Sequence, residues 1–237
     1  MSDPIVFLPG WCVGRGPLQA TADALGGRFI DLPGYREMPP VGDFGAAAEA
    51  IAARLQPRTT LVGWSLGAQL ALAVAALAPG KVGKLVLIAG TASFVQRAGW
   101  PHAMPPDTLA EFTAAVGADV EAMLPRFVGG FNRGDARSKE VTRAILDLAD
   151  LRPPGEVLAT GLAWLRDVDL RPDAPRVAAP TLLMHGAADP LMPLPAAEAL
   201  AALIPGATLA AFADCAHAPF ISRPDDFRTR LRSFLHD

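Results

Sequence analysis

Residues 61–70 read Leu-Val-Gly-Trp-Ser-Leu-Gly-Ala-Gln-Leu, a Gly-x-Ser-x-Gly motif between a short apolar run and an alanine-rich segment that reaches about Ala78. This order predicts a strand, a sharp turn and a helix, which is the context of a nucleophile elbow. Gly63 and Gly67 remove side chains where the strand and the helix crowd together. The turn lifts the hydroxyl of Ser65 clear of the sheet, so Ser65 is the predicted nucleophile. A small-residue turn without chemistry is the alternative interpretation.

Length and composition indicate one sizeable domain. Of the 237 residues 51% are hydrophobic and 19% are charged, which is enough apolar material for a large buried core. The net charge of −3 gives no reason to expect nucleic acid or a membrane surface as a partner. The sequence contains neither a long uncharged apolar run nor a basic N-terminal region followed by one. We therefore expect a cytoplasmic protein that acts as a monomer.

Two cysteines, Cys12 and Cys215, are too few for a disulfide framework or for a metal site of their own. Neither lies in a turn like that of Ser65. We therefore interpret both as buried or semi-buried thiols without a chemical role, although a reactive thiol is the alternative for each.

Short apolar runs alternate with helical patterns over most of the chain. The expected strands are residues 5–8, 29–32, 61–64, 85–89, 181–184 and 208–212. The expected helices are residues 17–25, 44–55, the segment from the elbow to about 78, 196–203 and 225–235. Strands that alternate with helices in this way predict an α/β fold with a doubly wound, mostly parallel sheet.

The alternation stops between about Ser93 and about Pro175. This block shows helical patterns and almost no strand, and the expected helices are residues 107–116, 120–127, 139–148 and 154–164. We interpret an all-helical block between strands of one sheet as a lid inserted over the carboxyl edge of that sheet. The predicted division is a core of residues 1–92 and 176–237 and a helical lid of residues 93–175.

A serine hydroxyl needs an adjacent base near neutral pH, and the base needs an orienting acid. Asp189 follows the expected strand 181–184, and His217 follows the expected strand 208–212. Both therefore lie at carboxyl ends of strands, where open α/β sheets place their sites. The order serine, aspartate, histidine along the chain matches folds built around such an elbow. Ser65, Asp189 and His217 are the predicted catalytic residues.

The remaining candidates for base and acid suit these roles less well. His236 stands one residue from the C-terminus, His102 lies in the expected lid, and His185 is too close in sequence to the expected acid. Asp214 is the rival acid, but it lies only three residues before the expected base on the same loop, so Asp189 is preferred.

The oxyanion of a tetrahedral intermediate needs two N–H donors. The residue after the nucleophile, Leu66, supplies one backbone N–H in elbow folds. The second is expected from Trp11, in the loop Pro9-Gly10-Trp11-Cys12 after the first strand. The Trp11 indole is also a candidate for the wall of the pocket.

These motifs together resemble the α/β-hydrolase superfamily, and more narrowly the pimeloyl-[acyl-carrier protein] methyl ester esterases of biotin synthesis. The narrow resemblance is carried by Gly63–Gly67 with its Trp64, by His217–Phe227, and by residues 99–101, 106–109 and 168–171, which resemble the two ends of the esterase lid. Two features depart from the family. Pro9-Gly10 stands where many relatives have His-Gly, and the sequence begins almost directly with its first strand, without the family's leading β-hairpin.

The narrow resemblance implies a serine carboxylesterase without metal or organic cofactor, which hydrolyses the methyl ester of pimeloyl-[acyl-carrier protein]. It implies a substrate pocket lined by Trp11, Trp64, Leu66, Phe127 and Phe131. It also implies a docking surface for an acidic acyl carrier protein on the lid, with Arg126, Lys139 and Arg143.

Two patterns in the lid bear on these implied roles. From residue 123 to residue 143, five basic residues stand against two acidic ones, an excess that would steer an acidic partner. An ordinary solvated helix face is the alternative. Gly129-Gly130 predicts a helix end between Phe127 and Phe131, and core packing is the alternative for either ring.

Other functions share these motifs. A small-ester or lactone hydrolase and a hydrolase of C–C bonds in diketones would use the same serine, histidine and aspartate. A non-catalytic binding protein with a hydrolase fold is a third alternative. The intact Ser65, Asp189 and His217 argue against it, because such proteins usually lose one of the three.

Overall fold

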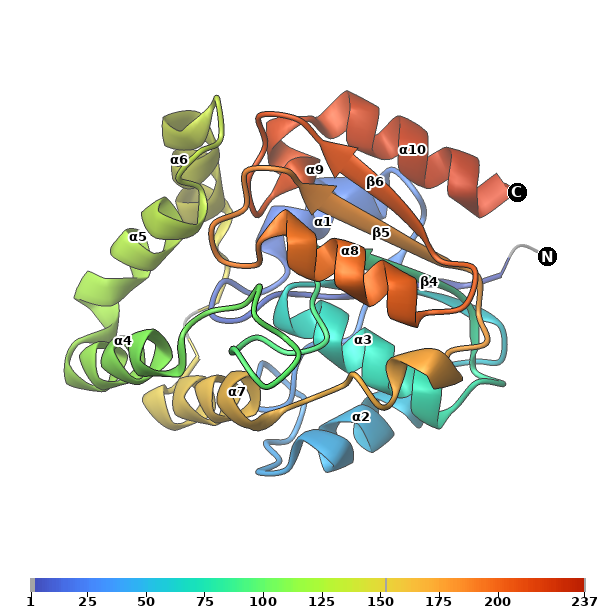
Figure 1. The fold of residues 1–237 in the computed structure, drawn as a ribbon, viewed down its shortest axis with the longest axis horizontal. Coiled ribbons are helices and arrows are strands. Elements are labelled where there is room, and N and C mark those ends of the chain that lie inside the picture. Colours follow the sequence, from blue (N-terminus) through green and yellow to red (C-terminus); the bar gives the residue numbers. More distant parts are fainter. Residues whose placement is uncertain (1–2, 152, 237) are drawn as a thin grey trace.

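The computed structural model describes residues 3–151 and 153–236, and six parallel strands form its central sheet (Figure 1). The strands are β1 (Ile5–Leu8), β2 (Arg28–Phe29), β3 (Thr59–Trp64), β4 (Val82–Ile88), β5 (Thr181–Gly186) and β6 (Thr208–Phe212). They lie in the order β2-β1-β3-β4-β5-β6, and every neighbouring pair is parallel. The strand order reverses at β1, so a crevice opens between the carboxyl ends of β1 and β3.

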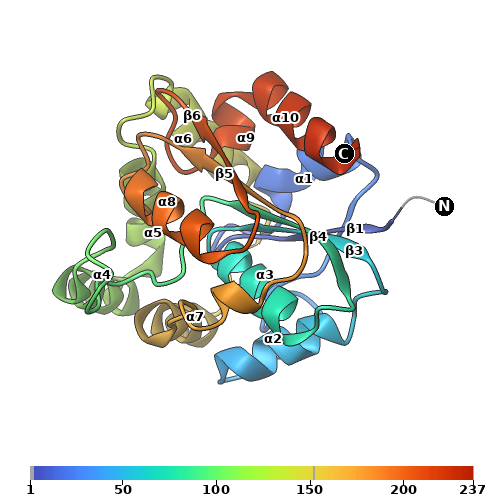
Figure 2. The ribbon, with the colours of Figure 1, turned by 45° about the vertical axis from the view of Figure 1, so that its right-hand side comes forward.

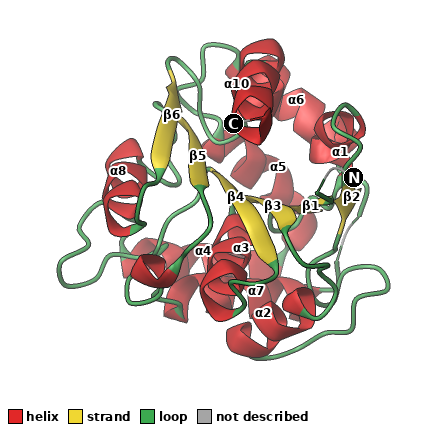
Figure 3. Ribbon diagram, turned by 90° about the vertical axis from the view of Figure 1, so that its right-hand side faces the viewer, coloured by secondary structure: helices red, strands yellow, loops and turns green. Residues whose placement is uncertain are grey.

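Helices cover both faces of the sheet. Figure 3 shows α2 (Phe44–Ala52), α3 (Leu66–Leu77) and α8 (Leu194–Leu203) on one face, and α1 (Gly16–Asp23) and α10 (Pro224–His236) on the other. The short helix α9 (Pro219–Ser222) lies beside α1 and α10 (Figure 2). Strands β3 and β5 are buried along their whole length, as expected for a parallel sheet between two helical layers. This explains why their central residues, Leu61-Val62 and Leu182-Leu183-Met184, are apolar without alternation.

Four helices follow β4 before the chain returns to the sheet at β5: α4 (Pro106–Ala118), α5 (Val120–Phe131), α6 (Ser138–Leu148) and α7 (Gly155–Asp167). A 3-10 helix, η1 (Ala174–Arg176), then leads into β5. Helices α4, α5 and α6 lie beyond the carboxyl ends of β5 and β6 (Figure 1). The division of the chain into a core and a lid at residues 93 and 175 stays a prediction.

In the part of the chain that the structure describes, no helix is both long enough and apolar enough to cross a membrane.

Several expected element bounds are wrong, by up to four residues. The second strand is Arg28–Phe29 rather than residues 29–32, because the chain turns away after Ile30 and Asp31 binds Arg15. The helix expected over 44–55 ends at Ala52. Helix α5 runs through the two glycines to Phe131, whose ring packs on Trp64. At this position tertiary packing outweighs the low helix propensity of glycine.

The two glycines of the elbow are where the fold is tightest. A Cβ on Gly63 would overlap the carbonyl oxygen of Gly67 in α3, and one on Gly67 would overlap the carbonyl oxygens of Leu8 and Pro9. Strand β3, helix α3 and the loop after β1 therefore approach one another at backbone distance. The crowding expected from the motif is present, and it fixes the position of Ser65 at the centre of the turn.

We expect Gly63→Ala to lower the free energy of unfolding by about 1–3 kcal/mol or more, because the new methyl group has no space. Gly117, near the end of α4, has no atom within 4 Å of the position of a Cβ. Gly117→Ala is the matched control, and it should raise stability by up to about 1 kcal/mol through its helix propensity. Urea unfolding of both variants measures the difference, and equal shifts would contradict the role given to Gly63.

Candidate active site

Ser65 occupies the turn between β3 and α3 with φ 58° and ψ −119°, in a region that side-chain-bearing residues rarely adopt. Such a conformation costs of the order of 1–3 kcal/mol and persists only where the surroundings enforce it. Here the N–H of Ser65 donates to the carbonyl of Ile88 at 2.9 Å, and its carbonyl accepts from Ala68 at 2.9 Å. The turn is therefore held from both sides, and the hydroxyl opens on a cavity.

His217 and Asp189 form a buried pair at the ends of β6 and β5. Nδ1 of His217 lies 2.7 Å from one carboxylate oxygen of Asp189. The other oxygen accepts from the backbone N–H groups of Leu191 at 2.9 Å and Met192 at 3.0 Å. Because the carboxylate only accepts, Nδ1 carries the proton, and Nε2 keeps its lone pair. An imidazole in this tautomer is able to take a proton from a hydroxyl.

Asp214, the rival acid, lies elsewhere. Its side chain is exposed, whereas Asp189 is 4% exposed and contacts the imidazole. The carbonyl of Asp214 accepts from Ala136 at 3.0 Å and from Arg223 at 3.3 Å. The structure therefore brings Asp189, and not Asp214, together with His217.

The loop that carries His217 is also tied to the elbow. The indole N–H of Trp64 donates to the carbonyl of His217 at 3.0 Å, which joins the end of β3 to the loop after β6. The ring of Phe131 lies 5.0 Å from the imidazole, centroid to centroid. Gly186 permits the close approach of the loops after β5 and β6, because a Cβ there would overlap carbonyl oxygens of Cys215 and Ala216.

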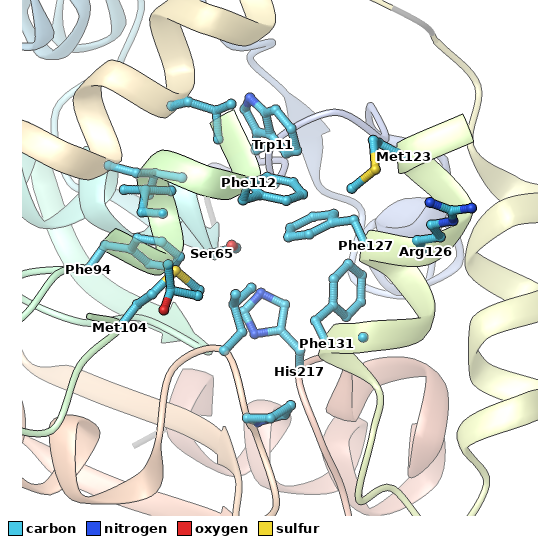
Figure 4. Close-up of a pocket in the computed structure, with 18 of the residues that line it drawn as sticks. Trp11, Ser65, Phe94, Met104, Phe112, Met123, Arg126, Phe127, Phe131 and His217 are labelled. Carbon is cyan, nitrogen blue, oxygen red and sulfur yellow. The ribbon is translucent and has the colours of Figure 1, made fainter. Parts of the chain in front are cut away.

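Ser65 and His217 line one cavity of about 390 Å³ (Figure 4). Its other walls are mainly apolar side chains from the loop after β1 and from helices α4, α5 and α7. Trp11, Trp64, Phe127 and Phe131, the aromatic residues that the family resemblance implies for a substrate pocket, line it. Among the described residues of the wall Leu66 is absent, because its side chain is buried in the core and 1% exposed. For Leu66 the side-chain role is wrong, and the backbone N–H remains.

Aromatic rings form a continuous wall on the side of the cavity that faces α4 and α5. Phe112 of α4 and Phe127 of α5 lie 5.0 Å apart, and both contact the indole of Trp11, at 5.9 and 5.3 Å. The indole N–H of Trp11 donates to the carbonyl of Leu158 in α7 at 3.1 Å. Gly161, which has no side chain, leaves room for the indole. Phe112 was missed from the sequence. Its spacing of three and four residues from Leu109 and Val116 marks one helix face but gives no sign of a pocket.

The predicted docking residues do not form one group. Arg126 lines the cavity, and so does Arg133, which the sequence did not single out. Lys139 and Arg143 lie on α6 along a separate surface groove. Arg143 is 85% exposed and lies 3.5 Å from Asp147, one turn further along the helix.

Both cysteine thiols and the imidazole of His185, next to the site, are buried. Cys12 and Cys215 are free, and burial raises the pKa of the Cys12 thiol well above its usual range and that of Cys215 to about 12. Both stay protonated near neutral pH and are poor nucleophiles. Nε2 of His185 donates to the carbonyl of Met192 at 2.6 Å, and burial lowers the pKa of its imidazole. His185 therefore supports the loop after β5 as a neutral ring.

Burial of His185 makes stability depend on pH. Its pKa is lower in the folded state than the ordinary value of 6.5, so below pH 6.5 the unfolded chain binds more protons and the fold loses stability as the pH falls. The loss is at most about 1.4 kcal/mol for each pH unit. His185→Gln keeps a donor for Met192 without the titration. We expect it to flatten the urea-unfolding stability between pH 7 and pH 5, and parallel profiles for variant and wild type would contradict this.

Comparison with known proteins shows the family of the chain. The alpha/beta hydrolase family matches residues 5–230. The chain is 39% identical to a pimeloyl-[acyl-carrier protein] methyl ester esterase of Aromatoleum aromaticum over 94% of each chain, and 36% identical to one of Nitrosomonas europaea over 94% of this chain and 92% of that one. The solved esterase EaEST from Exiguobacterium antarcticum superposes with a TM-score of 0.85 at 26% identity, over all of this chain and 92% of that chain. The resemblance drawn from the sequence is confirmed, and the chain belongs to the alpha/beta hydrolase family.

Proposed function

We propose that this protein is a serine carboxylesterase that hydrolyses the methyl ester of pimeloyl-[acyl-carrier protein] in biotin synthesis. The observation that carries the proposal is one apolar cavity into which both the Ser65 elbow and the His217 imidazole, bound to Asp189, open. The high similarity to esterases of that name over nearly the whole chain supports this choice of substrate.

In this proposal Ser65 Oγ attacks the carbonyl carbon of the ester while Nε2 of His217 takes the hydroxyl proton. The tetrahedral intermediate collapses when the same nitrogen returns the proton to the methoxy oxygen, and methanol leaves. Water then attacks the acyl-serine, gives a proton to His217, and the free carboxylate is released as Ser65 recovers its proton. Asp189 stays ionised and stabilises the imidazolium that forms twice in the cycle.

The oxyanion of each intermediate is assigned to the backbone N–H groups of Leu66 and Trp11. Leu66 is the first residue of α3, so its N–H lies at the positive end of the helix dipole. The loop that carries Trp11 is fixed by two hydrogen bonds: the indole donates to Leu158, and the N–H of Cys12 donates to the hydroxyl of Tyr35 at 3.0 Å. Donors that are held before the reaction cost no reorganisation during it.

The lid, residues 93–175, is proposed to bind the acyl chain and the carrier. Aromatic walls from Trp11, Phe112 and Phe127 suit the methylenes of a pimeloyl chain whose terminal ester reaches Ser65. Arg126 at the cavity and the α6 pair Lys139 and Arg143 offer positive charge to an acidic carrier.

Ser65→Ala should lower ester hydrolysis by about 10⁴–10⁶-fold without unfolding the protein. Asp189→Asn should lower kcat by about 10⁴-fold, because the imidazole then takes the wrong tautomer. Asp214→Asn is the matched control and should leave kcat unchanged. Turnover of a p-nitrophenyl ester and labelling by a fluorophosphonate measure all three. Equal losses at the two aspartates, or labelling of Ser65→Ala, would contradict the assignments.

Charge reversal tests the carrier. Lys139→Glu/Arg143→Glu should lower kcat/KM for pimeloyl-carrier methyl ester by roughly tenfold at low salt, and leave a short p-nitrophenyl ester unaffected. Arg126→Glu is measured separately, because Arg126 lines the cavity. Arg176→Glu is the control. This exposed arginine precedes β5 and therefore lies at the amino ends of the strands, whereas the lid lies at their carboxyl ends.

Turnover of the short ester without turnover of the carrier substrate would leave a general small-ester hydrolase and contradict the biotin role. Equal loss on both substrates in the α6 variant would indicate a damaged lid and contradict the docking surface.

A further inference from the structure

The loop between α5 and α6, residues 132–137, lies against both loops that carry the histidine–aspartate pair. Gly134 adopts φ +97°, and a Cβ there would come 3.0 Å from the carbonyl oxygen of Ala188, the residue before Asp189. The N–H of Ala136 donates to the carbonyl of Asp214 at 3.0 Å, three residues before His217. The lid helices are therefore joined to the ends of β5 and β6 through this loop.

Asp135 is the centre of that contact. Its side chain is buried, with the residue 6% exposed, and it accepts three hydrogen bonds from three different segments. One carboxylate oxygen accepts from the N–H of Arg137 at 2.7 Å and from the hydroxyl of Ser222 in α9 at 2.9 Å. The other accepts from the N–H of Ala216 at 3.0 Å. Ala216 is the residue immediately before His217.

The surroundings favour a carboxylate at this position. A carboxylate has two oxygens that only accept, so it suits three converging donors better than an amide, whose NH2 group would face one of them. Arg223 of the same cluster donates to the hydroxyl oxygen of Ser222 at 3.0 Å and to the carbonyl of Asp214 at 3.3 Å. Its positive charge lies close to the buried negative one.

The contact to Ala216 fixes the backbone from which the imidazole projects. The imidazole of His217 is held by Asp189, and the carbonyl of His217 is held by the indole of Trp64. The N–H of Ala216 is held by Asp135, so the lid supplies the restraint on the amino side of the histidine. A buried N–H that loses its acceptor must move to find another, and the side chain next to it moves too.

We infer that Asp135 is a positioning residue, which holds His217 against Asp189 and at the cavity when the loop of the lid is seated. The catalytic consequence rests on the proposed function, because it requires His217 to be the base. Asp135 is not among the described residues that line the cavity, and in this inference it takes no proton in the reaction. Through Asp135, the position of the His217 imidazole depends on whether the loop 132–137 of the lid is packed against the loops after β5 and β6.

The test compares Asp135→Asn, which keeps the size of the side chain, with Ser222→Ala, which removes one bond to the same carboxylate on the side away from His217. Both variants are assayed on a short p-nitrophenyl ester, which needs no carrier. Their folding is checked by thermal unfolding. The ring N–H proton of His217 is followed by NMR and assigned by its absence in His217→Gln, because it reports the bond to Asp189 without turnover.

Asp135→Asn should lower kcat at least about tenfold and change KM by less than about twofold. The loss of kcat could reach the roughly hundredfold that a misplaced catalytic group costs. The His217 ring proton should shift or broaden. Ser222→Ala should change kcat by less than about twofold and leave the resonance in place. Equal kcat values for the two variants together with an unchanged resonance in Asp135→Asn would overturn the inference.

A second variant keeps the inference testable if Asp135→Asn fails to fold. Gly134→Ala keeps the Asp135 side chain itself, but it pushes the loop that carries Asp135 away from Ala188, so it should lower kcat and shift the same resonance. An unchanged kcat and resonance in a folded Gly134→Ala would overturn the inference. A wild-type protein inactive on every ester would instead overturn the proposed function, while the comparison of resonances still decides whether Asp135 holds His217.

Discussion

The crowding of backbone at the elbow is the constraint on which the rest of the structure depends. At Gly63 and Gly67 there is no space for a Cβ between β3, α3 and the loop after β1, and Ser65 in the turn between them is forced to a positive φ. The same close approach puts the N-terminus of α3 next to the loop that carries Trp11. One packing arrangement thus fixes the turn at Ser65 and brings together the two segments whose N–H groups we assign to the oxyanion.

The polar groups around the elbow are held by backbone atoms more than by other side chains. The carboxylate of Asp189 accepts from two N–H groups, the indole of Trp64 donates to a carbonyl, and the imidazole of His185 donates to another. Buried polar groups need partners, and a backbone partner belongs to a fixed element. These bonds fix the loop after β5 and join the end of β3 to the loop after β6, and the bond between Asp189 and His217 joins the two loops to each other.

The sequence was informative where the signal is local. The elbow motif, the continuous apolar runs and the order of serine, aspartate and histidine predicted the sheet and the residues that meet at its edge. It failed where long-range packing decides. Phe112 and Arg133 reach the cavity only because α4 and α5 fold over it, and Phe131 stays helical because of its contact with Trp64. Asp135 belongs to no motif, since two of its three partners, Ala216 and Ser222, lie more than eighty residues away.

The positive φ of Ser65 also limits what evolution is able to do at this position. A side chain branched at Cβ, such as threonine, is strongly disfavoured at φ 58°, whereas unbranched cysteine and the more tolerant aspartate meet a smaller penalty. The backbone therefore filters which nucleophiles are open to the chain by single substitution. A new nucleophile at position 65 would therefore be the thiolate of cysteine or the carboxylate of aspartate. The secondary alcohol of threonine is disfavoured by the backbone alone, whatever its chemical reactivity.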